Sequence, residues 1–270
     1  MRLRRLLLVP QIVRLAAQAP RDGSTRWDGY WASVTSTGDG GDVLWDSSTS
    51  NEAEHYLDLL STHADADLPI VDVGCGNGRF TRALATRFPG AIGLDLSRHA
   101  ITRARHESAS VPDLQFRTLD MTADRSGRAL AAEFGPCNVF IRGVLHVLTP
   151  PARRRMAANL AELLGTVRAT ALVAETNYPG SLLGYLENLG ARPTTFPTAL
   201  GRAISAGIPR PAPFGDTELD DTFPTDRWNH LHTDNGVRIS TVPSHRSETI
   251  GSIPGLVALL RPWRGPSSPH

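Results

Sequence analysis

The stretch at residues 69–78 constrains the fold of this chain most, because a short apolar run ends there in three glycines at alternate positions. Ile70, Val71 and Val73 suit a buried strand. The glycines, which can take positive φ and let a ligand approach the backbone, are Gly74, Gly76 and Gly78. A helix beginning near Asn77 would point its free N–H groups into the same crevice. The stretch predicts a strand, a ligand-binding turn and a helix, with an ordinary tight connection as the alternative.

Strand-like and helix-like segments alternate from residue 69 onward, which indicates a parallel sheet covered on both faces. A helix over 51–63, with Ser50 as its N-cap, leads into this region. The expected strands cover 69–73, 91–96, 114–119, 138–141 and 170–174. The expected helices cover 78–88, 97–107, 124–134 and 150–165, the last opened by Pro150 or Pro151 and ended by Gly165.

The composition changes after residue 177. Prolines and glycines accumulate over 178–225 around a short helical piece at 182–189, and we interpret this segment as an inserted substrate cap. Regularity returns with a helix near 226–232 and strands at 236–242 and 256–260. The tail after Arg261 is rich in proline and is expected to be disordered.

Residues 1–50 are interpreted as an N-terminal helical tail and a lid segment. The apolar run at 6–9 follows several arginines but is short and interrupted, so an amphipathic or frayed helix is favoured over a signal peptide. Three aromatic residues, Trp27, Tyr30 and Trp31, then stand close together. They either staple a helix to the core or form a flap that closes over a substrate, and we count them as substrate-binding candidates.

The overall composition favours no polymer as partner. The formal net charge of the 270 residues is +1, which gives no electrostatic argument for nucleic acid or for an acidic membrane surface. No stretch approaches the length needed to cross a bilayer. The two cysteines do not suggest a disulfide framework, so a reducing, cytoplasmic location is expected. We expect a small-molecule acceptor as partner and leave a homodimer open.

The polar residues that follow each expected strand are the candidates for ligand binding, since ligands of open α/β sheets bind outside the carboxyl ends of the strands. Asp95 follows the second strand, and its carboxylate suits the two hydroxyls of a ribose. Asp120 follows the third strand. Arg142 and Gly143, with His146 shortly after, follow the fourth.

The glycine spacing disfavours a dinucleotide, because the sixth position of the fingerprint is Arg79 instead of glycine. Asp72-Val73-Gly74-Cys75-Gly76-Asn77-Gly78 instead resembles the first motif of the class I S-adenosylmethionine-dependent methyltransferases. The resemblance covers residues 51–177 and 226–262, which we take as the cofactor-binding domain. It implies a Rossmann-like seven-stranded mixed α/β sheet, in the order 3-2-1-4-5-7-6, with helices on both faces.

The same resemblance assigns roles to residues of this chain. It implies that Asp95 and the adjoining Leu96 contact the ribose, that Asp120 faces the adenine amino group, and that Met121 lies beside the ring. Backbone at Arg142 and Gly143 would line the methionine end. The motif residues Asp72, Cys75 and Asn77 complete the expected cofactor site, and S-adenosyl-L-methionine is the expected cofactor.

The acceptor side is less constrained by the sequence. His146 is suited to take a proton near neutral pH, although a structural or substrate-shaping role is also open. Glu175 and Asn177 follow the fifth strand and are substrate-binding candidates, and Glu175 could instead cap the following turn. His230 and His232 would not share a helix face, so no metal site is expected. The basic run at 153–155 is interpreted as a solvated helix face.

These observations predict a methyltransferase acting on a small or medium-sized acceptor, with oxygen favoured over nitrogen. The chain lacks the Asn/Asp-Pro-Pro-aromatic tetrad of enzymes that methylate nucleic-acid bases. Two alternatives stay open. One is a non-catalytic protein that binds the cofactor or acts as a scaffold, and the other is a different transferase on the same fold, such as an aminopropyl transferase.

Overall fold

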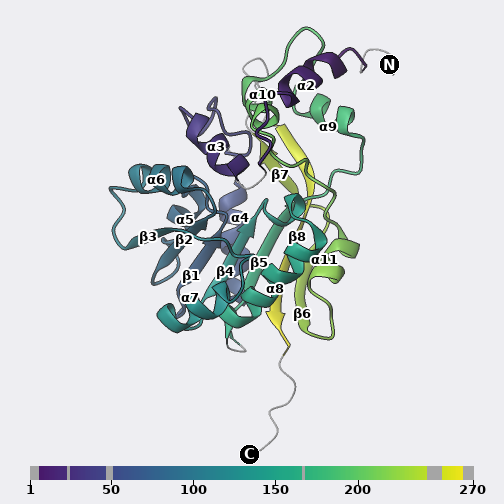
Figure 1. Cartoon of the computed structure of the whole chain (residues 1–270). Helices are drawn as coiled ribbons and strands as arrows, with labels where there is room; N and C mark the ends of the chain where they lie inside the picture. Colours follow the sequence, from purple (N-terminus) through teal and green to yellow (C-terminus); the bar gives the residue numbers. More distant parts are fainter. Residues whose placement is uncertain (1–5, 23–24, 47–50, 166–167, 242–250, 264–270) are drawn as a thin grey trace, which may run out of the picture.

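A computed structural model describes residues 6–22, 25–46, 51–165, 168–241 and 251–263. Within these residues a single sheet of eight strands carries the fold, with the strand order β3-β2-β1-β4-β5-β8-β6 and β7 paired to β8 (Figure 1). The strands are β1 (Ile70–Val73), β2 (Ala91–Asp95), β3 (Leu114–Thr118), β4 (Asn138–Arg142), β5 (Ala171–Thr176), β6 (Trp228–Asp234), β7 (Arg238–Thr241) and β8 (Gly251–Pro262).

The first five strands are parallel, and their register brings their carboxyl ends to one edge of the sheet. Val73 at the end of β1 aligns with Leu94 on β2 and with Ile141 on β4. β8 runs antiparallel to β5 and β6. The predicted order 3-2-1-4-5-7-6 is confirmed, with β8 in the place of the seventh strand, and one additional strand, β7, extends the sheet.

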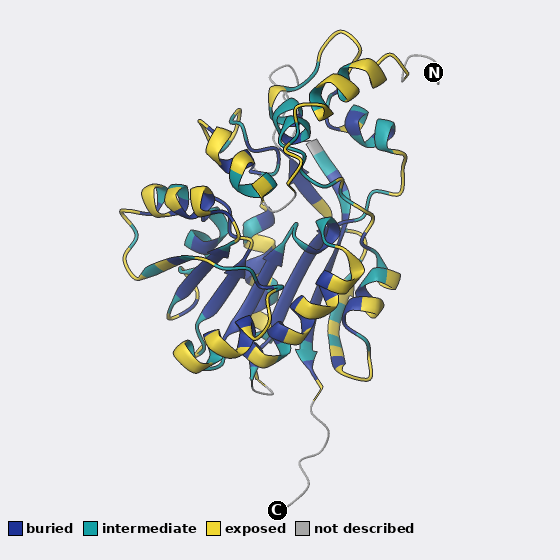
Figure 2. Cartoon of the chain, in the orientation of Figure 1, coloured by how far each residue is buried: buried dark blue, intermediate teal, exposed yellow. Residues whose placement is uncertain are grey.

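Helices cover both faces of the sheet, and their outward surfaces are exposed while the strands are buried (Figure 2). The helices around the sheet are α4 (Glu52–His63), α5 (Arg79–Leu84), α6 (Arg98–Glu107), α7 (Ser126–Phe134), α8 (Pro150–Leu164) and α11 (Asp216–Thr222). As predicted, α8 opens on Pro150 and ends at Gly165. Proline is tolerated at the first position because that N–H has no partner within the helix.

The alternation of side chains along the strands divides the core into two parts. Val71, Val73 and Ile141 point to the face covered by α7, α8 and α11. Ile70 and Phe140 point to the opposite face and pack against α4 and α5. Apolar residues on both faces of each strand explain why these strands are continuous hydrophobic runs in the sequence.

A second layer lies over the carboxyl edge of the sheet (Figure 1). It contains α2 (Val9–Ala16), α3 (Arg26–Ser33), α9 (Leu182–Asn188) and α10 (Thr198–Ser205). These helices contribute to two small apolar clusters of their own. α11 lies elsewhere, because Phe214, Leu219 and Phe223 belong to the main core beside α8. The segment 178–225 therefore supplies both the layer above the site and part of the core.

Several sequence predictions for the C-terminal region and the histidines are wrong. The helix expected near 226–232 is the strand β6. The strand expected at 236–242 is confirmed, and it is the additional strand β7. β8 is longer than the expected 256–260. His230 and His232 therefore lie on a strand, where the His230 ring contacts the carbonyl oxygen of Phe223 and the His232 ring stacks on His63. Ser50 and the tail at 264–270 lie outside the described residues.

The basic run at 153–155 is also only partly as expected. Arg154 and Arg155 are exposed, but Arg153 is buried and donates from Nε to the carbonyl oxygen of Leu145 at 2.8 Å. Its guanidinium also lies over the ring of Phe214. Arg153 thus fixes the segment after β4 instead of facing water.

Candidate active site

The glycine turn after β1 has the geometry that its sequence indicates. Gly74, Gly76 and Gly78 have φ of +78°, +55° and +75°. A Cβ on Gly74 would lie 2.4 Å from a methyl carbon of Val144, and one on Gly76 would lie 2.8 Å from the Trp31 ring. The turn can therefore be approached closely only because these residues lack side chains.

Asp95 stands at the end of β2, directly beside the glycine turn. Its Oδ2 accepts from the Gly76 N–H at 3.0 Å and its Oδ1 accepts from the Ser97 N–H at 2.8 Å. Burial raises the pKa of the Asp95 carboxyl to about 6, although both N–H groups oppose the rise. Each oxygen retains a lone pair that can accept from a ligand hydroxyl.

Asp72 and Cys75 are enclosed groups of the motif. Burial, together with the charge of Asp95, raises the pKa of Asp72 to about 7, although the Thr81 hydroxyl donates to the Asp72 Oδ2 at 2.6 Å and opposes the rise. Burial also raises the pKa of the Cys75 thiol well above its ordinary value. A thiol in such surroundings is unreactive, so Cys75 serves as a small residue in the turn.

Asp120 and Met121 follow β3 on the far side of the same crevice. The Asp120 Oδ1 accepts from the N–H and the hydroxyl of Thr122, both at 2.7 Å. The buried Met121 is fixed through its carbonyl oxygen, which accepts from the Asn159 amide on α8 at 2.9 Å. These contacts hold a carboxylate and a flat apolar surface together at the end of β3.

Two cavities of the described residues adjoin each other. The first, which we call the crevice, is lined by the glycine turn, Asp95, Leu96, Asp120, Met121, Trp31 and other residues at the strand ends. The second, which we call the chamber, is lined mainly by aliphatic residues of α2, α9, α10 and β7 and by His146. The residues shared by the two walls are Trp27, Trp45, Arg142, Gly143 and Val147. Ligands in the two cavities would therefore meet at this shared wall.

The lid, which we define as α3 with residues 34–46, is tied to the sheet domain on both sides of the glycine turn. At one side Asp28 accepts from the Ser97 hydroxyl at 2.9 Å and contacts the His99 ring. Although burial works against ionisation, the hydrogen bonds from His99 and Ser97 lower the pKa of Asp28 to about 2. Asp28 is thus a negative charge at the first turn of α6, where the helix dipole favours it.

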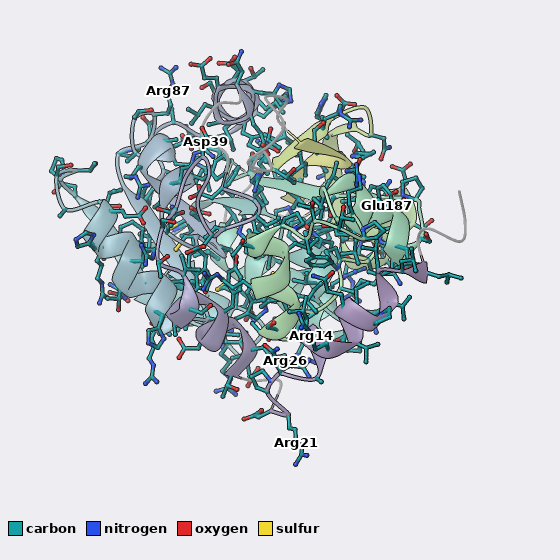
Figure 3. The ribbon with its side chains drawn as sticks, turned by 90° about the horizontal axis from the view of Figure 1, so that it is seen from above. Arg14, Arg21, Arg26, Asp39, Arg87 and Glu187 are labelled. Carbon is teal, nitrogen blue, oxygen red and sulfur yellow. The ribbon has the colours of Figure 1, made fainter. Side chains whose placement is uncertain are left out.

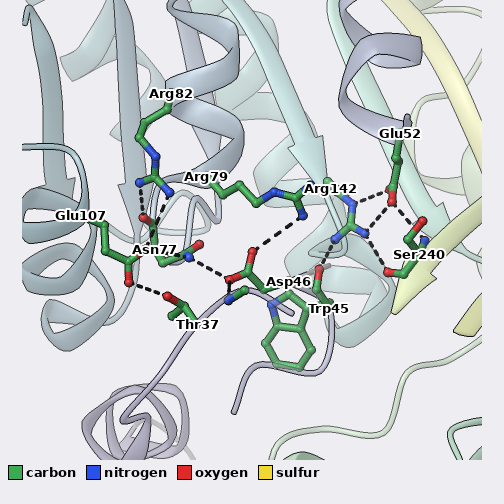
Figure 4. Close-up of polar contacts among 11 residues, drawn as sticks. Thr37, Trp45, Asp46, Glu52, Asn77, Arg79, Arg82, Glu107, Arg142 and Ser240 are labelled. Carbon is green, nitrogen blue, oxygen red and sulfur yellow. Dashed lines mark hydrogen bonds and ion pairs between the residues drawn. The ribbon is translucent and has the colours of Figure 1, made fainter. Parts of the chain in front are cut away.

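At the other side of the turn, Asp46 and Glu107 hold the loop of the lid (Figure 4). The Asn77 amide donates to Asp46 at 2.9 Å and to Glu107 at 3.0 Å. Glu107 also accepts from the Thr37 hydroxyl, and Arg79 approaches Asp46 at 3.8 Å. The side chain of Asn77 therefore positions the lid. Asn77 also lines the crevice, and its contact with the cofactor stays a prediction.

Arg142, in the wall between the two cavities, is held by a buried ion pair (Figure 4). Its guanidinium donates to both oxygens of Glu52 on α4, at 2.6 and 3.1 Å, and to the carbonyl oxygens of Trp45 and Ser240. Burial alone would lower the pKa of Arg142, but Glu52 raises it above its ordinary value. The charge is thus compensated within the protein, and Arg142 acts as a fixed part of the wall.

His146 lies in the chamber wall, on the 3₁₀ turn Leu145–Val147 that follows β4. Its Nδ1 is 2.5 Å from Glu175, and the same carboxylate accepts from the N–H groups of Val144 and Leu145 at 2.9 and 2.7 Å. A carboxylate accepts only, so we assign the proton to Nδ1. Nε2 is then the ring nitrogen with a free lone pair, and no described residue bonds to it.

The other predicted acceptor residues occupy different places. Glu175 is fully buried behind His146, and Asn177 lines neither cavity. Trp27 lines both cavities and Trp31 lines the crevice. Tyr30 lines neither, because it is fully buried and stacks on Trp45. Tyr30 is therefore the staple, whereas substrate contact by Trp27 and Trp31 stays a prediction.

Sequence reasoning missed Asp28, Asp46 and Glu52. Asp28 and Asp46 belong to the N-terminal lid, and no motif links them to α6 or to the glycine turn. The burial of Glu52, at the start of α4, could have been predicted from the sequence. A helical projection of 51–63 places it on the same face as Tyr56 and Leu60, which are buried.

Two classes of site are absent from the part of the chain that the structure describes. No group of three or more His, Cys, Asp or Glu residues is arranged to hold a metal ion there. The helices of that part are also too short or too polar for any to cross a bilayer.

Comparisons with known proteins show what this chain resembles. Residues 70–166 match the family model of a methyltransferase domain. A structure of an S-adenosylmethionine-dependent methyltransferase from Anabaena variabilis matches with a TM-score of 0.77 and 22% identity, over 91% of this chain and 97% of that chain. No curated protein matches the chain.

Two further structures have the same fold. One belongs to a study of the conversion of a disulfide bond into a thioacetal group during echinomycin biosynthesis (TM-score 0.60, 20% identity, 89% of this chain and 91% of that chain). The other is magnesium protoporphyrin IX methyltransferase from Synechocystis PCC 6803 with bound S-adenosylhomocysteine (TM-score 0.50, 15% identity, 78% and 82%). At these identities the likeness concerns the fold.

Proposed function

We propose that this chain, which its matched domain and its fold identify as a class I S-adenosylmethionine-dependent methyltransferase, methylates an oxygen atom of a small acceptor held in the chamber. The residues of the crevice fit the cofactor. Asp95 would accept from the ribose hydroxyls, Asp120 and Met121 would hold the adenine, and the glycine turn would admit the rest of the cofactor to the backbone.

The sulfonium of the cofactor supplies a methyl group that is already activated, so the protein mainly has to position the acceptor and remove its proton. The arrangement of His146 is the observation that carries the proposal. Glu175 binds Nδ1, which leaves Nε2 as a base in the chamber wall close to the shared residue Gly143. An acceptor hydroxyl must lose a proton as it is methylated, and a neutral imidazole suits that step.

The open alternatives receive less support. An aminopropyl transferase needs carboxylates for a polyamine, yet the described residues of the chamber wall include no aspartate or glutamate. A scaffold without activity would not require a base held by a buried carboxylate. Oxygen is favoured over nitrogen as the methylated atom, because methylation of an amine does not need a base in the site. A neutral amine attacks first and can lose its proton to water afterwards.

The test combines cofactor binding with an acceptor screen. Titration calorimetry with S-adenosylhomocysteine measures the crevice, and methyl-labelled donor with a panel of phenols, carboxylic acids, amines and thiols measures transfer. We expect transfer to oxygen, and we expect His146→Gln to lower kcat by about 10²- to 10⁴-fold while the affinity for S-adenosylhomocysteine stays unchanged. Transfer to amines alone would contradict oxygen methylation. Absence of cofactor binding by the folded protein would contradict the whole proposal.

Glu175→Gln is the matched variant for the positioning role of the carboxylate. It keeps the shape of the side chain but offers Nδ1 an amide instead of a charged acceptor. We expect kcat to fall while the affinity for S-adenosylhomocysteine is retained. If Glu175 had a purely structural role, the substitution would lower kcat, this affinity and the stability together.

A further inference from the structure

The charged and strongly polar side chains that we compare in the chamber wall are all basic. Among its described residues these are Arg26, Arg142, His146 and Arg210, and the rest of the wall is mostly aliphatic. No aspartate, glutamate or lysine is present in this described lining. A cationic acceptor would find no counter-charge in such a cavity, whereas an anionic one would.

The positive groups differ in whether their charge is already compensated. Arg142 is paired with Glu52, and His146 is bonded to Glu175. The side chain of Arg26, at the first turn of α3, forms no hydrogen bond or ion pair with another described residue, and its Nε is buried without a partner. A buried donor without an acceptor costs free energy, so Arg26 is the group in this wall that a ligand can satisfy.

The Arg26 guanidinium packs against Gly207 in the segment that follows α10. Gly207 packs on it so closely that a Cβ there would lie 3.3 Å from the Arg26 Nε and 2.9 Å from the Cβ of Ala19. Arg210 follows Gly207 by three residues and also lines the chamber. His146 lies on the turn after β4, in sequence between the shared wall residues Gly143 and Val147.

We propose that the acceptor is an amphipathic anion, with an apolar body in the chamber and an oxyanion group, such as a carboxylate or sulfonate, bound by Arg26, while Arg210 adds a positive charge to the same wall. The guanidinium fork can bind two oxygens of such a group at once. Anchoring at Arg26 would leave the remainder of the acceptor free to reach His146 in the same wall. This inference rests on the proposed function, since it names the substrate class of the same site.

A pair of dyes tests the charge preference without knowledge of the natural acceptor. The anionic 8-anilino-1-naphthalenesulfonate and the neutral N-phenyl-1-naphthylamine share one apolar framework and differ in the sulfonate. With S-adenosylhomocysteine present, we expect the sulfonate to bind about tenfold more tightly or better by fluorescence titration. Arg26→Gln should remove most of this difference and leave the affinity for the neutral dye unchanged.

Arg21 provides the matched control, because it is exposed and extends away from the body of the molecule, whereas Arg26 lies against it (Figure 3). Arg21→Gln should leave both affinities unchanged. Ala203→Phe fills the chamber from α10 and should weaken both dyes, which places the binding in this cavity. The affinity for S-adenosylhomocysteine shows that each variant is folded.

The outcomes separate this inference from the proposed function. Equal affinities, tighter binding of the neutral dye, no binding of either dye, or a preference that survives in Arg26→Gln would each overturn the anionic acceptor. If S-adenosylhomocysteine binds and only neutral or cationic compounds are methylated, the inference fails while the methyltransferase stands. If the sulfonate preference holds but the folded protein binds no S-adenosylhomocysteine, it is the proposed function that fails.

Discussion

The surroundings of the crevice carboxylates Asp95 and Asp72 determine whether each is ionised and which groups it can bind. Asp95 is held by two backbone N–H groups with its pKa raised to about 6, so it is ionised and able to accept near neutral pH. Asp72, one strand away, is buried with its pKa raised to about 7 and bonded to Thr81. Both residues line the crevice, but the Asp72 carboxylate already accepts from a side chain of the protein, whereas, among the described residues, Asp95 accepts only from backbone N–H groups.

Replacing Asp95 should weaken cofactor binding. Asp95→Ala removes a charged acceptor for the ribose hydroxyls, so we expect a loss of about 1–3 kcal/mol in the binding free energy of S-adenosylhomocysteine. Calorimetry measures it, with the exposed Asp58→Ala as control. The affinity of the wild type should also fall as the pH drops through about 6, because the protonated carboxyl accepts less well. An unchanged affinity would refute this role.

Asp72 should make the free protein less stable at high pH. A carboxyl whose pKa is raised from 3.8 to about 7 on folding binds its proton more tightly in the folded state, so the free energy of unfolding falls as pH rises through this range. Asp72→Asn removes this cost while its amide oxygen still accepts from Thr81. We expect a gain of roughly 2–4 kcal/mol at pH 8 that shrinks toward pH 4.

Urea unfolding at several pH values measures the effect of Asp72→Asn, and Asp58→Asn serves as the exposed control. A difference between wild type and Asp72→Asn that does not change with pH would show that Asp72 carries no titrating cost.

At the scale of elements, the ion pair of Arg142 and Glu52 joins four segments. Arg142 ends β4, Glu52 begins α4, and the pair also bonds to Ser240 on β7 and to Trp45 in the lid. Because one charge is buried only in the presence of the other, the two cannot be removed separately without cost.

Glu52→Gln should therefore destabilise the protein strongly. It leaves the Arg142 guanidinium buried with a neutral partner, and we expect a loss of about 3–5 kcal/mol in the free energy of unfolding. Glu54→Gln on the same helix removes an exposed carboxylate and should change stability little. Denaturant titration compares the two variants, and equal effects would argue against the ion pair as a tie between these elements.

The elements that could be predicted from the sequence are those defined by local interactions. The glycine turn, the five parallel strands and the residues after them depend on local patterns, and these predictions hold for β1 to β5. The strand at 236–242 was predicted as well, but the segment at 226–232 was taken for a helix, because its apolar side chains, Trp228 and Leu231, are three residues apart and give no alternating pattern. Only pairing with β8 makes it a strand.

The site divides in the same way. Asp95, Asp120 and His146 were found because the end of a strand is visible in sequence. The pairing of His146 with Glu175 and of Arg142 with Glu52 joins residues far apart in the chain, and neither spacing nor composition reveals it.

For the whole molecule, cofactor binding should appear as stability. A ligand that binds only the folded state at 100 times its Kd adds about 2.7 kcal/mol, which for a protein of this size raises Tm by roughly 5–10 °C. We expect this shift with S-adenosylhomocysteine in a thermal melt. NADH should give no shift, because Arg79 stands where a dinucleotide-binding turn has its third glycine. A larger shift with NADH would contradict the cofactor assignment.

The wall between crevice and chamber also bears on how such an enzyme can be altered. Its central residue, Arg142, is fixed by the sheet domain through β4 and α4, while the far walls of the chamber come from α2, α9 and α10. Substitutions in those three helices can therefore change which acceptor binds without changing how the methyl donor binds. Libraries aimed at new acceptors should vary the helices and leave the partition untouched, so that donor use and acceptor scope can evolve separately.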